Sequence, residues 1–257
     1  MTPLAEEAPR ADHVLGARRA LVIMLVFIVV QFIVGVLIGI GAGVYVRVSR
    51  GMADPAAMAD VLALVLLPAA IAGVAAAGFV ALWMARRTLP GAINAGALTP
   101  LGWMPSAPSE MAKASLTGCI ISLVYLIVLV PISPPAEGQL WGPLAASVLA
   151  GGWPRHLWAG FALLLAPPIE EFVFRGVLLR GLSNALGIRA AAIVVTLAFV
   201  VLHACQTLSY WPAWMGITLL ASAAVLFRLR TRSLLPAIGV HASYNLILVV
   251  AVYARAV

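Results

Sequence analysis

The chain carries little charge for its length. Only 10% of its 257 residues are Asp, Glu, Lys or Arg, and 63% are hydrophobic. A soluble domain carries about 25% charged residues, so this composition excludes an ordinary soluble protein and indicates a chain whose surroundings are mostly lipid. The net charge of +7 predicts no nucleic-acid partner, because Lys and Arg collect at the cytoplasmic ends of membrane helices.

Cysteines and acidic residues are also scarce. The two cysteines, Cys119 and Cys205, lie in separate apolar stretches, which excludes a disulfide framework. Beyond Glu137 the only acidic residues are Glu170 and Glu171. A charged side chain in hydrocarbon costs several kcal/mol unless it is paired or lines a wet cavity. The two glutamates therefore mark the region where a functional site is expected.

Long apolar stretches dominate the sequence instead. A spanning helix needs about 20 apolar residues, so the sequence predicts an all-α, polytopic transmembrane bundle of about seven or eight spanning helices. The eighth depends on Pro143–Ala150, a short apolar piece that is otherwise expected to be re-entrant or interfacial. The seven predicted spans are Ala20–Val46, Val61–Ala85, Leu116–Ile132, Leu157–Leu182, Ala190–Leu208, Ala213–Phe227 and Leu234–Ala254.

Three regions of the chain differ in character. Residues 1–19 form a polar tail, residues 20–150 hold transmembrane helices with almost no polar side chains, which are expected to face lipid, and residues 151–257 hold helices with ionisable groups. The sequence predicts a multi-pass protein of the cell membrane with its N-terminus in the cytoplasm. This orientation obeys the positive-inside rule, because most cations then fall on the inner side. The cations left outside are Arg47, Arg50, Arg155 and Arg255.

Two adjacent prolines precede the glutamates. Proline removes a backbone donor and clashes one turn back, yet it suits a first helical turn. Pro167 and Pro168 therefore predict a break near Ala166, followed by a half-helix. Glu170 and Glu171 then fall in its first turn, where free N–H groups and the helix dipole favour anions.

Residue spacing separates the expected roles of the polar side chains. Glu171 and Arg175 are four residues apart with the acid first, the favourable order for an ion pair, so the two are expected to satisfy each other. Glu170 has no such partner on its helix. His241 and Asn245 are also four residues apart, so both are predicted to face one space.

A second intramembrane histidine completes the set. His203 lies one turn after Phe199, whose ring is predicted to pack against the imidazole. Glu170 and His203 can share a water molecule and take a proton from it, while His241 and Asn245 can donate hydrogen bonds to an oxyanion. The four fit general-base hydrolysis of a carbonyl compound. Their expected depths agree only within about 10 Å, so the helices must shift or tilt for them to meet.

Three short stretches, taken together, resemble a known family. "EEFVFR" (170–175), "FVVLH" (199–203) and "HASYN" (241–245) are similar to the Glu-Glu-x-x-x-Arg, Phe-x-x-x-His and His-x-x-x-Asn motifs of the CAAX protease and bacteriocin-processing (CPBP, or Abi) family of intramembrane proteases. The resemblance covers roughly residues 155–253. Residues 151–257 are accordingly expected to be a CPBP-type catalytic helical core.

The resemblance implies an intramembrane endopeptidase. Its expected partners are the lipid bilayer and a peptide or protein substrate in or at the membrane, whose peptide bond is cut by water. Glu170 and His203 would activate the water, and His241 and Asn245 would stabilise the oxyanion. The resemblance also implies that Glu171 and Arg175 order the site.

A metal cofactor and two other functions remain open. No cofactor is favoured, although the family has often been labelled metalloprotease. Zinc could be held by Glu170, His203 and His241 with one open position, but the sequence has no His-Glu-x-x-His motif. The first alternative function is a proton-coupled membrane transporter, because intramembrane acids and histidines also mark ion pathways. The second is a non-catalytic membrane immunity or scaffold protein that kept the site.

Overall fold

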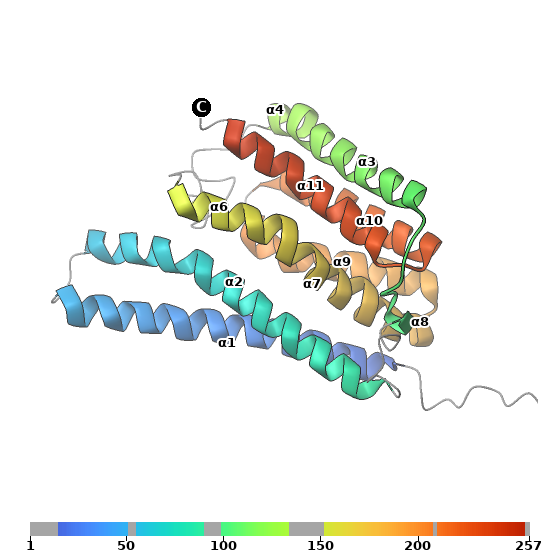
Figure 1. Ribbon diagram of the computed structural model, residues 1–257, viewed down its shortest axis with the longest axis horizontal. Coiled ribbons are helices and arrows are strands. Elements are labelled where there is room, and N and C mark those ends of the chain that lie inside the picture. The colour runs from blue at the N-terminus through green and yellow to red at the C-terminus, as the bar shows by residue number, and fades with distance from the viewer. Residues whose placement is uncertain (1–14, 51–54, 90–98, 134–151, 208–209, 255–257) are drawn as a thin grey trace, which may run out of the picture.

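The computed structural model describes residues 15–50, 55–89, 99–133, 152–207 and 210–254. Within these ranges every regular element is helical (Figure 1), so the predicted all-α class is confirmed. Six helices there are long and apolar enough to cross a membrane, and Ile188–His203 is a shorter apolar helix. Pro143–Ala150 lies outside the described residues, as does most of the predicted tail.

The chain begins with a long helical hairpin that lies along one side of the bundle (Figure 1). It consists of α1 (Ala17–Arg50) and α2 (Pro55–Thr88), each longer than the predicted span. Ala77, Ala81 and Ala85 of α2 have no exposed surface. Such small residues at helical spacing let helices approach closely in a membrane, where association depends on packing.

The third spanning helix begins earlier than predicted. After the short η2 (Thr99–Leu101), α3 (Pro108–Val124) continues through the π-helical η3 (Tyr125–Leu129) into α4 (Val130–Ile132). Proline in the first turn and Glu110 close behind it are favourable at a helix start.

The fourth spanning helix corrects one prediction. The backbone runs without a break from Gly152 to Leu186, so the predicted break near Ala166 is wrong. The π-helical η4 precedes the prolines, and the Ala166 N–H donates to Phe161 O, five residues back. This wider turn accommodates the proline rings, which would clash one turn back in a regular α-helix. The helix comprises α6 (Gly152–Gly160), η4 (Phe161–Leu165), α7 (Ala166–Glu171), η5 (Phe172–Leu178) and α8 (Leu179–Leu186).

In a continuous helix, the cost of burying the two glutamates must be offset by contacts with other side chains. Glu170 and Glu171 lie inside a continuous helix, not in the first turn of a new one. The free N–H groups of a helix start therefore do not offset the cost of their burial. Side chains elsewhere in the bundle take that role, among them His241 of another helix, which bonds to Glu171.

Three helices complete the bundle. Gly187, with φ of +77°, joins α8 to α9 (Ile188–Thr207). The next helix, α10 (Trp211–Thr231), extends the short predicted span at both ends, and α11 (Leu235–Ala254) follows it. Figure 1 shows α10 and α11 stacked with α3 on the side of the bundle away from α1.

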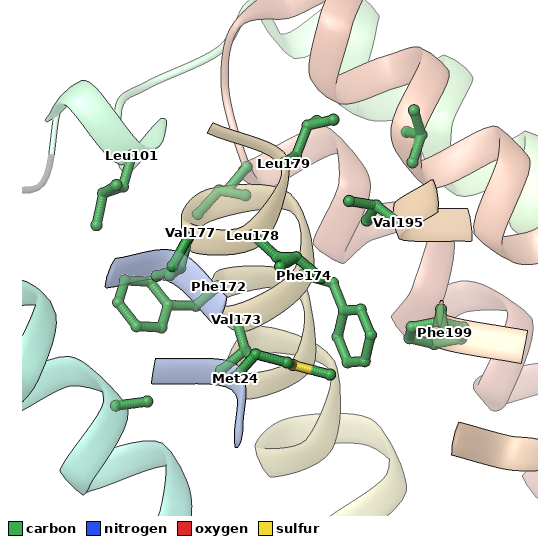
Figure 2. Close-up of a cluster of buried hydrophobic side chains, with 14 of the residues drawn as sticks. Met24, Leu101, Phe172, Val173, Phe174, Val177, Leu178, Leu179, Val195 and Phe199 are labelled. Carbon is green, nitrogen blue, oxygen red and sulfur yellow. The ribbon is translucent and has the colours of Figure 1, made fainter. Parts of the chain in front are cut away.

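The segment η5 lies at the centre of the bundle. All of its residues, Phe172–Leu178, are buried. Figure 2 shows their side chains spreading in several directions, toward Met24 of α1, Leu101 of η2, and Val195 and Phe199 of α9. A helix that is enclosed on all sides holds its polar side chains in defined positions, because its neighbours limit every rotamer.

Candidate active site

The predicted ion pair lies in the interior of the bundle. Glu171 Oε1 is 3.1 Å from Arg175 Nη1, and both side chains are completely buried. Arg175 Nη2 also donates to Ala221 O of α10 at 3.0 Å. Burying two charges costs about as much as their attraction returns, so the pair contributes little net stability. It does tie the centre of the fourth helix to α10.

Glu171 has a second partner that the spacing did not predict. His241 Nδ1 is 3.0 Å from Glu171 Oε1. A carboxylate can only accept, so Nδ1 must carry the hydrogen of this bond. The His241 side chain is buried, with 4% of the residue exposed, and its ring is held in one orientation. The other ring nitrogen, Nε2, faces Glu170.

His203 is oriented by its own helix. Its Nδ1 is 2.9 Å from Phe199 O, and since a carbonyl only accepts, Nδ1 is the donor. The rings of Phe199 and His203 stack with centroids 4.3 Å apart, which confirms the predicted packing. Phe199 also contacts the guanidinium of Arg175, whose Cζ lies 4.4 Å from the ring centroid. In neutral His203 the acceptor is therefore Nε2.

Glu170 lies between the two imidazoles. Its Oε2 is 3.6 Å from His203 Nε2 and 3.9 Å from His241 Nε2. Both separations exceed a direct hydrogen bond, and this buried oxygen has no hydrogen-bond partner among the described residues. Polar atoms at such separations are suited to contact through one water molecule.

A cavity of about 650 Å³ joins the predicted residues. Glu170, His203, His241 and Asn245 all line it, so the structure brings together the four side chains predicted to act. Asn245 Nδ2 donates to Ala162 O of η4 at 2.8 Å, and an amide nitrogen has a second hydrogen to offer. The volume is typical of small-molecule and peptide side-chain sites.

The other wall of this cavity was not predicted. It is formed by α1 and α2, whose helices were expected to face lipid. Gln31 is its polar member. The signal for it was present in the sequence, since Gln31 is the one amide in an uncharged apolar run. The apolar residues of this wall are Phe27, Ile28, Phe32, Gly35, Val36, Leu67, Ala70 and Val74.

The same side chains do not form a zinc site. Within the described part of the chain, no group of three or more His, Cys, Asp or Glu residues is arranged to hold a metal ion. Glu170, His203 and His241, the ligands predicted for zinc, are therefore not arranged as such a group.

The fold and the site together define a class of protein. This is a multi-pass membrane protein with a glutamate and two histidines on one interior cavity. Residues 152–247 match a family model described as type II CAAX prenyl endopeptidase Rce1-like. This match agrees with the resemblance of the three motifs to the CAAX protease and bacteriocin-processing family. No curated protein and no solved structure matches the chain.

Proposed function

We propose that the protein is an intramembrane endopeptidase that hydrolyses a peptide bond of a membrane-associated peptide or protein. The observation that supports this most strongly is the 3.6 Å separation of Glu170 Oε2 and His203 Nε2 on the wall of the cavity. Both atoms are hydrogen-bond acceptors when His203 is neutral. A water molecule can donate to both at once, which directs its lone pair away from them and toward a substrate carbonyl.

In the proposed reaction Glu170 is the general base. It takes the proton of the water as the oxygen attacks the carbonyl carbon, and a tetrahedral intermediate forms. Glu170 then gives this proton to the leaving amine, which breaks the C–N bond. His203 holds the water in line, a contribution of orientation. General acid–base catalysis of this kind contributes about 10²- to 10⁴-fold.

His241 and Asn245 are proposed to stabilise the oxyanion. As an imidazolium, His241 keeps Nδ1–H on Glu171 and presents Nε2–H to the cavity. Asn245 presents its second amide hydrogen beside it. The charges then balance, since the carboxylates of Glu170 and Glu171 face the cations of Arg175 and His241. Glu171 and Arg175 act as positioning residues.

Loss of peptide cleavage on removal of the base tests this proposal. The protein is purified in detergent and incubated with quenched fluorescent peptides of apolar sequence. The Glu170→Gln variant is expected to lose about 100-fold or more in kcat, and His203→Ala a comparable factor. The matched controls are Glu110→Gln and His156→Ala, whose side chains bond to Arg230 and Tyr253 at the surface.

The controls are expected to keep full activity. Cleavage that is unchanged in both Glu170→Gln and His203→Ala would rule out the proposed mechanism. Substrate-dependent proton flux in liposomes, without any cleavage by the wild type, would assign the site to a transporter instead.

A further inference from the structure

The cavity extends beyond the segment that matches the family. Its catalytic wall comes from the fourth helix, α9 and α11, whereas the facing wall comes from α1 and α2. Phe32 of α1 lines the cavity and is 73% exposed. The cavity is therefore open along α1, on a side of the bundle that faces lipid. A substrate lying in the membrane would meet this wall before it reached Glu170.

A glutamine on such an apolar wall is energetically unfavourable unless its amide has hydrogen-bond partners. Gln31 lies in the apolar helix α1, which holds an 18-residue stretch with a mean hydropathy of 3.2, and there an unsatisfied amide is costly. Among the described residues its side chain makes one hydrogen bond, from Nε2 to Phe27 O of its own helix, at 3.4 Å. The side chain still has a second N–H donor and an oxygen acceptor. Both can be directed into the cavity that Gln31 lines.

We infer that Gln31 binds a main-chain peptide group of the substrate, beside an apolar side chain held by α1 and α2. A primary amide offers one donor and one acceptor close together, which matches the C=O and N–H of an extended peptide. The neighbouring Phe27, Phe32 and Leu67 offer only apolar surface, so they suit a large nonpolar side chain. This inference rests on the proposed function, since it assigns a binding residue to the same cavity.

The first test is cleavage of apolar peptides by the Gln31→Leu variant. Leucine is similar in size and suits the membrane, so folding is expected to persist. Loss of one neutral hydrogen bond lowers kcat/KM by about 2- to 12-fold, and the effect should appear in KM. Peptides in which single amides are replaced by esters identify the contact. At one position the ester should weaken the wild type and leave Gln31→Leu unaffected, which a structural role for Gln31 would not produce.

The second test measures binding without catalysis. In a background with Cys119→Ala and Cys205→Ala, the thiol of a Gln31→Cys variant is alkylated in the presence of a peptide with a reduced, uncleavable bond. The matched control is Ile33→Cys. Ile33 is 48% exposed and outside the cavity lining, and it lies about 200° around the helix at nearly the same depth.

Protection of the Gln31→Cys thiol alone is the expected result, and it holds even if no peptide is cleaved. If the peptide slowed the alkylation of neither thiol, the inference would be overturned. A value of kcat/KM unchanged by Gln31→Leu for every peptide would overturn it too. Failure of the proposed function would be observed differently, as absence of cleavage by the wild type.

Discussion

Removal of Glu171 should damage stability and activity for separable reasons. The carboxylate has no exposed surface and accepts from both Arg175 Nη1 and His241 Nδ1. In Glu171→Leu the guanidinium of Arg175 stays buried without its counter-charge. Breaking a buried pair in this way costs about 3–5 kcal/mol of the free energy of unfolding. His241 also loses the acceptor that orients its ring.

The double variant Glu171→Leu, Arg175→Met separates the two effects. With both charges replaced by apolar groups, the desolvation cost disappears, so stability should return to within about 1–2 kcal/mol of the wild type. Activity should not return, because nothing then holds His241 as an oxyanion donor. Loss of one such donor lowers kcat by about 10²- to 10³-fold.

Two measurements check this prediction. Unfolding of the detergent-solubilised protein by a denaturing detergent gives relative stabilities, and hydrolysis of a quenched fluorescent peptide gives kcat. Recovery of both stability and kcat in the double variant would refute the reasoning, because it would mean that Glu171 acts only by neutralising Arg175. A Glu171→Leu variant as stable as the wild type would also refute it, because the unpaired, buried guanidinium of Arg175 would then cost nothing.

The remaining predictions concern packing, metal and orientation. A Cβ at Gly118 would overlap Val240 O and Ser243 Oγ of α11, so Gly118→Ala should lower the unfolding midpoint; Gly43→Ala, where a Cβ meets nothing within 4 Å, should hold or raise it. If the reaction uses no metal, prolonged dialysis against EDTA should leave peptide cleavage unchanged, whereas a loss restored by zinc would contradict the mechanism above. If the N-terminus is cytoplasmic, a protease-sensitive N-terminal tag should resist externally added protease in intact cells, and its rapid removal there would reverse the orientation.

The spans were predictable because they depend on composition along a single helix. Apolar runs of about 20 residues can satisfy their backbone in lipid only as helices, and all seven predicted runs are helical over nearly all of their described residues. The ends were less predictable. The third helix starts at Pro108, well before the predicted Leu116, because a helix start depends on caps and on contacts with other segments that hydropathy does not register.

The predicted helix break at the proline pair was wrong because it was based on the local sequence alone. Two adjacent prolines normally end a helix, since each removes a donor. Here a π-helical turn precedes them and the helix continues to Leu186. Neighbouring helices enclose this stretch, since Ala166 and Pro167 are buried and so is every residue from Phe172 to Leu178. A local pattern cannot report that enclosure.

The sequence by itself determined the inventory of the site. It placed one ion pair at i,i+4, one histidine beside Phe199, and one histidine and one amide on a shared face. These are relations within single helices, where 3.6 residues per turn makes spacing sufficient. The convergence of Glu170, His203 and His241 was a requirement of the proposed chemistry, and spacing along separate helices could not establish it.

The tertiary structure alone decided the contacts between helices. The bond from His241 to Glu171 joins residues 70 positions apart, and the wall that carries Gln31 belongs to helices that were expected to face only lipid. Which faces of two helices meet depends on side-chain packing over their whole length. No spacing within a single helix encodes that choice, so the partner of Glu171 and the second wall of the cavity emerge only when the helices are assembled.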